Sequence, residues 1–148
     1  MNNQIKNSFT NIFHNNLWRS SESVSGEGSR IRHTRTVSKI ILDVVNRFNV
    51  KSILDAPCGD FNWMRLVVEE LEGVDYTGLD IVSELIESNK SKFSQDGVNF
   101  YNKDITTDEL PMADLVICRD VFVHLSYSDT KKALLNIKKS GSKMLLAT

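Results

Sequence analysis

Two patterns of apolar residues alternate along most of the chain. Apolar residues recur every three or four positions, the spacing of an amphipathic helix, within residues 5–17, 37–48, 61–71, 82–93 and 127–139. Short apolar runs that are typical of buried strands occupy residues 51–55, 74–80, 98–101, 114–119 and 143–147. Gly73 and Gly141 end two of the helices, and Asp96-Gly97 predicts a turn. The chain therefore alternates predicted strands with predicted helices.

This alternation predicts one architecture. The order strand, helix, strand is typical of a parallel sheet with right-handed crossovers and helices on both faces. We therefore expect an α/β fold of the Rossmann-like, doubly wound type with a mainly parallel sheet. In such sheets ligands bind beyond the carboxyl ends of the strands, where the strand order reverses. Four acids lie at or just after predicted strand ends and indicate a site there: Asp55, Asp80, Asp104 and Asp120.

The first 36 residues differ from the rest and are expected to form an N-terminal cap, while residues 37–148 form the core domain. The cap begins with the helix over 5–17, which should end near Trp18. Residues 20–29 are rich in Ser and Gly, a composition that favours a flexible linker. A second hypothesis is that this segment closes over a ligand. The basic residues that follow it would then bind a carboxylate or phosphate: Arg30, Arg32, His33 and Arg35.

Composition narrows the class of protein. A chain of 148 residues with 41% apolar and 25% charged residues is typical of one soluble globular domain. The formal charge of -1 argues against a nucleic-acid or membrane-surface binder. The sequence has no membrane-spanning run and no secretion signal, so a cytoplasmic location is expected. Cys58 and Cys118 fit neither a disulfide framework nor a metal site, and we expect both to be small apolar residues near strand ends.

The stretch 52–63 carries the most specific chemistry. Asp80 follows Gly59 by about 20 residues, the separation at which an acid after the second strand binds a pair of ribose hydroxyls. The loop Pro57-Cys58-Gly59-Asp60 has a single glycine and lacks the G-x-G-x-x-G pattern that binds a pyrophosphate. Its acid would also repel phosphate. These residues therefore favour a nucleoside ligand that carries positive charge and no phosphate.

Four motifs in order resemble the class I S-adenosylmethionine-dependent methyltransferases, over about residues 37–148. The first is the loop 55–61, in which Pro57 and Phe61 replace usual glycines; the others are Asp80, Asp104 and the run 114–125. The resemblance implies S-adenosyl-L-methionine as cofactor and S-adenosyl-L-homocysteine as product. It implies that the cofactor-binding residues are Asp55, Ala56, Pro57, Cys58, Gly59, Asp60, Asp80, Ile81, Asp104, Ile105 and Arg119.

Methyl transfer from a sulfonium requires alignment of the acceptor, exclusion of water and, for some acceptors, removal of a proton. No metal is implied. Asp120 and His124 are the catalytic candidates for the proton, although a histidine at this position often only packs or bonds to backbone. Arg119 would orient an anionic acceptor or pair with Asp120. Asp60 would bind the cofactor's ammonium group or cap the following helix, and Trp63 would border the pocket or belong to the core.

The family fold has seven strands, whereas this chain supplies five. The last strand, over 143–147, would leave an apolar edge exposed, so we expect either a longer protein or a partner such as a second copy of the chain. Trp18 and residues 25–29 resemble methyltransferases of bacterial surface-polysaccharide loci, which implies a small-molecule or sugar-type acceptor. A non-catalytic cofactor-binding module and another Rossmann-like nucleotide enzyme remain alternatives.

Overall fold

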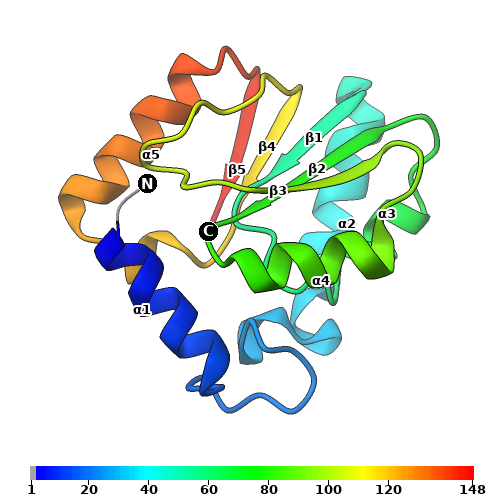
Figure 1. Cartoon of the computed structure of the whole chain (residues 1–148). Helices are drawn as coiled ribbons and strands as arrows, with labels where there is room; N and C mark the ends of the chain where they lie inside the picture. The colour runs from blue at the N-terminus through cyan, green and yellow to red at the C-terminus, as the bar shows by residue number, and fades with distance from the viewer. Residues whose placement is uncertain (1–2) are drawn as a thin grey trace.

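The computed structural model describes residues 3–148; residues 1 and 2 of the expected cap lie outside it. A single sheet of five strands forms the centre (Figure 1). The strands are β1 (Ser52–Asp55), β2 (Asp75–Asp80), β3 (Val98–Asn102), β4 (Leu115–Cys118) and β5 (Met144–Ala147). They follow the order β3-β2-β1-β4-β5, and each neighbouring pair is parallel. The predicted Rossmann-like fold is confirmed, and its strand order reverses between β1 and β4.

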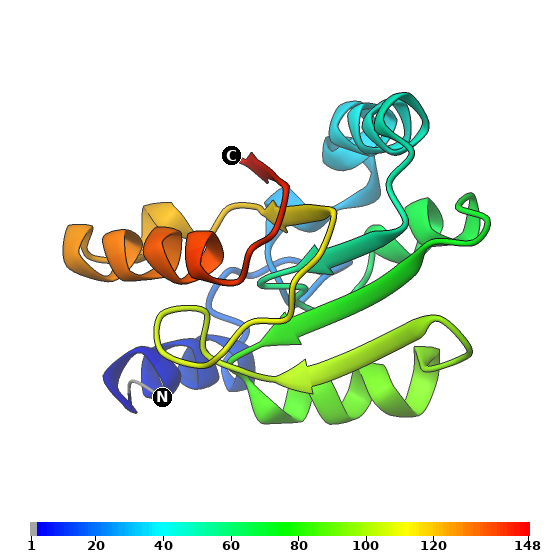
Figure 2. The ribbon, with the colours of Figure 1, turned by 90° about the horizontal axis from the view of Figure 1, so that it is seen from above.

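Helices cover both faces of the sheet, as Figure 2 shows from above. The helices are α1 (Asn3–His14), α2 (Ile31–Phe48), α3 (Met64–Glu69), α4 (Ser83–Phe93) and α5 (Tyr127–Lys139), with short 3-10 turns η1 (Glu27–Ser29) and η2 (Phe122–His124). Side chains of α2, α3 and α4 pack on one face of the strands. On the other face, Ile137 of α5 packs with Leu54, Leu79 and Val116. These two apolar layers hold the carboxyl ends of the strands at one edge.

Most predicted elements match the observed ones, and the cap differs. α1 ends at His14 rather than near Trp18, and α2 begins at Ile31, before the regular apolar pattern at residue 37. Residues 20–29, for which composition favours a flexible linker, contain the η1 turn and two buried serines, Ser20 and Ser23. The reason is local charge pairing that composition does not show.

Those charge pairs connect the cap to the start of α2. The Arg30 guanidinium pairs with Glu27 at 2.9 Å and with Glu22 at 3.4 Å, and the Ile31 N–H donates to Glu22 at 2.7 Å. The Arg30 side chain is therefore engaged by carboxylates of the chain itself. Within the described residues, no helix is long and apolar enough to cross a membrane. Cys58 and Cys118 are free and buried, as expected.

Candidate active site

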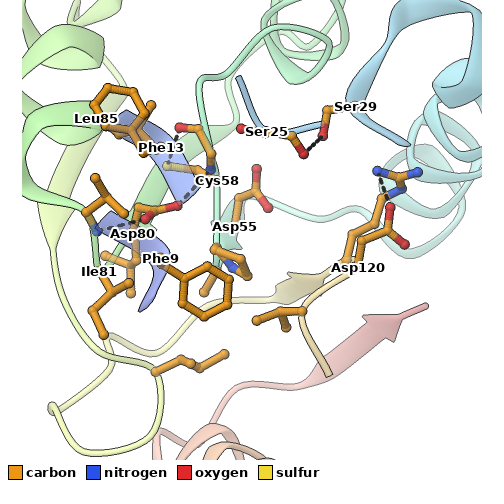
Figure 3. A pocket seen from close by; sticks show the side chains of 18 of the residues that line it. Phe9, Phe13, Ser25, Ser29, Asp55, Cys58, Asp80, Ile81, Leu85 and Asp120 are labelled. Atoms are coloured by element: carbon orange, nitrogen blue, oxygen red, sulfur yellow. Dashed lines mark hydrogen bonds and ion pairs between the residues drawn. The ribbon is translucent and has the colours of Figure 1, made fainter. Parts of the chain in front are cut away.

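A pocket lies at the carboxyl ends of the strands, at the point where the strand order reverses (Figure 3). Its base is the end of β1 with the loop that follows it. The end of β2 with the start of α4 forms one wall, and the residues after β3 and β4 form the others. Residues of α1 and of the segment 18–29 complete the lining. The fold thus places the four predicted acids around one pocket.

The pocket brings together most of the residues that the sequence singled out. The lining includes Asp55, Ala56, Pro57, Cys58, Gly59, Asp80, Ile81, Asp104, Ile105, Arg119 and Asp120. Among the described residues around the pocket, Asp60 and His124 are the two candidates that do not line it. Trp63 belongs both to the lining and to the buried core, at 6% exposure. The roles of these residues stay predictions, whereas their convergence is a property of the fold.

Asp80 joins the loop after β1 to the start of α4. Its Oδ2 accepts the Gly59 N–H at 3.1 Å, and its Oδ1 accepts the Val82 N–H at 2.9 Å. Burial raises the pKa of this carboxyl to about 6, and the hydrogen bonds from Val82 and Gly59 oppose that rise. Each carboxylate oxygen accepts more than one hydrogen bond, so Asp80 keeps acceptor capacity for two ligand hydroxyls.

Asp55 is the second buried carboxylate of the pocket. It is 3% exposed, and the Tyr76 hydroxyl donates to its Oδ2 at 2.7 Å. Burial raises its pKa to about 7; the Tyr76 hydrogen bond opposes the rise, the negative charge of Asp80 adds to it, and Arg119 opposes it. Two buried acids in one pocket favour a ligand with positive charge, because a cation stabilises both ionised carboxylates.

The wall after β3 combines an acid with apolar surface. Thr106 donates to Asp104 Oδ1 from its backbone N–H at 2.8 Å and from its hydroxyl at 2.6 Å, so the carboxylate, which is 1% exposed, is held in a fixed orientation. Ile81 and Ile105 add aliphatic surface to the same pocket. This arrangement suits a flat, largely apolar ring with a polar edge, such as a nucleobase.

The loop after β1 keeps its shape although Phe61 stands where a glycine is usual. Phe61 has φ of 59°, in the left-handed region that favours glycine. Its ring packs with Tyr76, Phe93 and Phe100 at centroid distances of 5.0, 5.3 and 5.1 Å. This aromatic packing offsets the backbone strain, which is on the order of 1–2 kcal/mol. A side chain in place of Gly59, also in the left-handed region, would overlap the Ser25 side chain.

Asp60 contacts the cap. Its carboxylate accepts hydrogen bonds from the Ser23 hydroxyl at 3.0 Å and from the Val24 N–H at 2.9 Å, while its own N–H donates to Ser25 Oγ at 2.9 Å. The helix that follows the loop, α3, has Trp63 at its N-cap position and no side-chain cap. The structure therefore shows Asp60 in a third arrangement, in which it attaches the segment 20–29 to the loop.

Asp120 and Arg119 lie together at the end of β4. Their side chains pair at 2.9 Å, and Arg119 also donates to the Gly28 carbonyl at 3.0 Å. The Asp120 side chain is 50% exposed. His124 lies outside the pocket, where its ring packs on Trp18 at a centroid distance of 5.4 Å. Of the two catalytic candidates, Asp120 alone has access to the pocket in the described structure.

Sequence reasoning missed lining residues in the cap, namely Ile5, Phe9, Phe13, Val24, Ser25 and Ser29, and others in the core, namely Leu79, Val82, Leu85, Lys103 and Thr106. The apolar pattern of α1 indicated a lid or packing helix, and Ser and Gly composition favoured a flexible linker. The signal that could have found the serines is the resemblance of residues 25–29 to one group of methyltransferases. Figure 3 shows Ser25 and Ser29 among the side chains that line the pocket.

Comparison with known proteins identifies the class. A family model described as "Methyltransferase domain" matches residues 54–140. The fold is that of the class I S-adenosylmethionine-dependent methyltransferases, and the chain belongs to this methyltransferase domain family. The cofactor is S-adenosylmethionine. No curated protein matches the chain.

Several solved structures share the fold. The methyltransferase domain of bacterial CtHen1-C matches with a TM-score of 0.67 and 14% identity over 80% of this chain and 65% of that one. Magnesium protoporphyrin IX methyltransferase from Synechocystis PCC 6803 with bound SAM has a TM-score of 0.66 and 16% identity. The match covers 90% of this chain and 70% of that one. N-methyltransferase NodS from Bradyrhizobium japonicum WM9 in complex with SAH has a TM-score of 0.66 and 13% sequence identity. The match covers 88% of this chain and 67% of the NodS chain. The chain spans 65 to 70% of these three structures, and 37 to 50% of the structures of human N-acetylserotonin methyltransferase and StiE O-MT.

The residues present fit this cofactor. A sulfonium nucleoside carries positive charge, a ribose with two hydroxyls and an adenine ring, and it has no phosphate. The pocket offers two buried carboxylates at Asp55 and Asp80, acceptor capacity on Asp80, and apolar surface beside Asp104. Charge and hydrogen-bonding capacity therefore agree with the family assignment.

Proposed function

We propose that this chain catalyses methyl transfer from S-adenosylmethionine to a small-molecule or sugar-type acceptor. The observation that carries the proposal is the pocket in which Asp55 and Asp80 lie buried while Asp120 lies exposed just after β4. The cover by α1 and the segment 18–29 favours an acceptor that fits inside a pocket. We also propose that the protein is cytoplasmic and that it acts in the synthesis of bacterial surface polysaccharides.

Bound S-adenosylmethionine supplies a methyl group on a positively charged sulfur. The chain's own residues orient the two reactants and exclude water, for which Phe9, Phe13 and Trp18 provide apolar cover. Asp120 accepts the proton of a hydroxyl acceptor through its carboxylate. Arg119 holds that carboxylate at 2.9 Å and so fixes its direction.

The experiment that tests the function uses S-adenosylmethionine with an isotopic label on its methyl group and a panel of sugars and small molecules. We expect a labelled product from at least one acceptor. In Asp120→Asn the rate of product formation is expected to fall about tenfold, below the usual range for a general base because the side chain is half exposed. Calorimetry with S-adenosylhomocysteine in the same variant reports separately on the cofactor site, because Asp120 pairs with Arg119.

The matched control is Asp96→Asn, which removes an exposed carboxylate before the start of β3. It should leave the rate unchanged. A chain that binds S-adenosylhomocysteine but methylates no acceptor would support a non-catalytic binding module instead. Tight binding of NADH would support a different Rossmann-like enzyme. A fall in rate in His124→Asn and none in Asp120→Asn would reject the proposed base.

We further propose that a partner strand covers the outer edge of β5. β5 pairs with β4 on one side and has no strand partner on the other among residues 3–148, and Leu145 is 41% exposed. Either a second copy of the chain or further strands of a longer protein would pair there. Light scattering is expected to give the mass of a dimer if a second copy is the partner; a monomer mass would reject that form of the proposal.

A further inference from the structure

In the loop after β1, the backbone N–H groups are already hydrogen-bonded to other groups of the protein. The N–H groups of residues 56–62, apart from Pro57 which has none, all donate inside the chain. Their acceptors are the carbonyls of Ile117, Leu79 and Cys58, the carboxylates of Asp80 and Asp60, and the Ser25 hydroxyl oxygen. A carboxylate on the ligand must therefore find its hydrogen-bond donors outside this loop.

Ser25 provides such a donor. Its Oγ accepts the Asp60 N–H at 2.9 Å, so its hydroxyl hydrogen remains able to donate. The side chain lines the pocket and occupies the space that a side chain on Gly59 would need. Two hydrogen bonds to the Asp60 carboxylate, from the Ser23 hydroxyl and the Val24 N–H, hold the two residues just before Ser25. Ser25 is thus fixed against the loop from a segment about 35 residues earlier in the chain.

The cations that line the pocket differ in position. Arg119 is 14% exposed on its side chain, is held by the Gly28 carbonyl and Asp120, and lies over the Trp63 ring at 5.6 Å. Through Gly28 it contacts the same segment that carries Ser25. Lys103 lies after β3 and donates to the Glu109 carbonyl at 2.9 Å. Arg119, which is paired with Asp120, therefore contacts the segment that carries the Ser25 hydroxyl.

We infer that the segment Ser23–Ser29 is part of the cofactor site, and that the Ser25 hydroxyl donates a hydrogen bond to the carboxylate of the cofactor's amino-acid part, with Arg119 supplying the nearby charge. The inference rests on the proposed function and goes beyond the family match, which begins at residue 54. It gives the cap a chemical role: residues before the matched domain recognise the end of the ligand that the loop after β1 cannot bind.

The test compares two ligands by calorimetry: S-adenosylhomocysteine, and its analogue that lacks only the carboxylate. In Ser25→Ala the affinity for S-adenosylhomocysteine is expected to fall about tenfold more than the affinity for the analogue. Loss of the hydrogen bond from the Asp60 N–H to Ser25 should weaken both ligands equally. The ratio of the two affinity losses therefore measures the contribution of the ligand carboxylate alone. Ser21→Ala, at an exposed serine just before the segment Ser23–Ser29, is the control and should change neither affinity.

Each outcome decides between defined possibilities. An equal loss for both ligands, or no loss for either, would overturn the assignment of Ser25. If Ser25→Ala does not fold, the wild-type chain still tests the inference, because it should bind S-adenosylhomocysteine at least tenfold more tightly than the analogue. Equal affinities would reject a carboxylate site. A folded wild-type chain that binds neither ligand would instead reject the proposed function.

Discussion

Replacing Asp80 with alanine is expected to lower the affinity of the chain for S-adenosylhomocysteine by about 10- to 150-fold, or ~1.5–3 kcal/mol of binding free energy. The change removes the acceptor for two ribose hydroxyls. It also removes the acceptor of the Gly59 and Val82 N–H groups, so the loop after β1 loses its connection to α4. Calorimetric titration of the folded variant beside the wild-type chain measures the effect.

Two further variants separate these contributions. Asp80→Asn keeps one acceptor oxygen and loses the charge, so its affinity should lie between those of the wild-type chain and Asp80→Ala. Asp75→Ala removes an exposed aspartate at the opposite end of β2 and should leave the affinity unchanged. If Asp80→Ala binds as tightly as the wild-type chain, the ribose is bound elsewhere and the assignment of Asp80 is wrong.

The same carboxylate makes cofactor binding depend on pH. Burial raises the pKa of Asp80 to about 6 and that of Asp55 to about 7 in the ligand-free chain. A positively charged ligand favours the ionised carboxylates, so the affinity for S-adenosylmethionine should fall as the pH is lowered from 8 to 5 and protons bind. In Asp80→Asn one of the two titrating groups is gone, and the dependence on pH should be shallower.

The sequence predicted the parts of this site that depend on local periodicity. The pattern over 127–139 gave the bounds of α5, and each of Asp55 and Asp80 ends a strand because an apolar run stops there. Parallel strands place their carboxyl ends at one edge, so the approach of these acids followed from the order of the elements.

The parts that were not predicted depend on contacts between distant residues. Asp60 accepts hydrogen bonds from Ser23 and Val24, and neither spacing nor composition reports a bond across that separation. Ser and Gly composition indicated a linker because it measures the lack of apolar surface, whereas polar hydrogen bonds order this segment. His124 does not line the pocket because it lies in the η2 turn and its ring packs on Trp18. The apolar pattern of the sequence did not predict this turn.

Asp55→Asn is expected to raise the free energy of unfolding of the ligand-free chain at pH 8. The Asp55 carboxyl is 3% exposed, and its burial raises the pKa to about 7 from a value near 3.8. An asparagine at this position does not ionise, and its carbonyl oxygen can accept the hydrogen bond that the Tyr76 hydroxyl gives to Asp55. The variant therefore keeps the packing and removes the cost of a buried charge.

The gain should depend on pH in a defined direction. Between pH 3.8 and 7 the folded wild-type chain holds a proton on Asp55 that the unfolded chain releases, so the contribution of this group to stability declines as the pH rises through that window. The advantage of Asp55→Asn over the wild-type chain should thus grow by about 2–3 kcal/mol from pH 5 to pH 8. Urea unfolding at both pH values measures the difference.

Asp114 supplies a control of opposite sign. A hydrogen bond from Lys143 and another from the Lys51 N–H lower its pKa, so its ionised form stabilises the folded chain above the ordinary pKa of an aspartate. Asp114→Asn should therefore lower stability at pH 8, and the loss should shrink as the pH falls below about 4. Asp55→Asn and Asp114→Asn both replace a carboxyl by an amide. Opposite changes in stability with pH would therefore come from the surroundings of each carboxyl.

The cofactor should reverse the order of stability that Asp55→Asn creates. A ligand that binds the folded state raises its stability in proportion to the logarithm of concentration over Kd. If the buried charge of Asp55 serves to bind a cation, saturating S-adenosylmethionine will raise the midpoint of unfolding of the wild-type chain more than that of Asp55→Asn. Equal shifts for both chains, with no gain in the ligand-free variant at pH 8, would mean that Asp55 is neither destabilising nor part of the cation's environment.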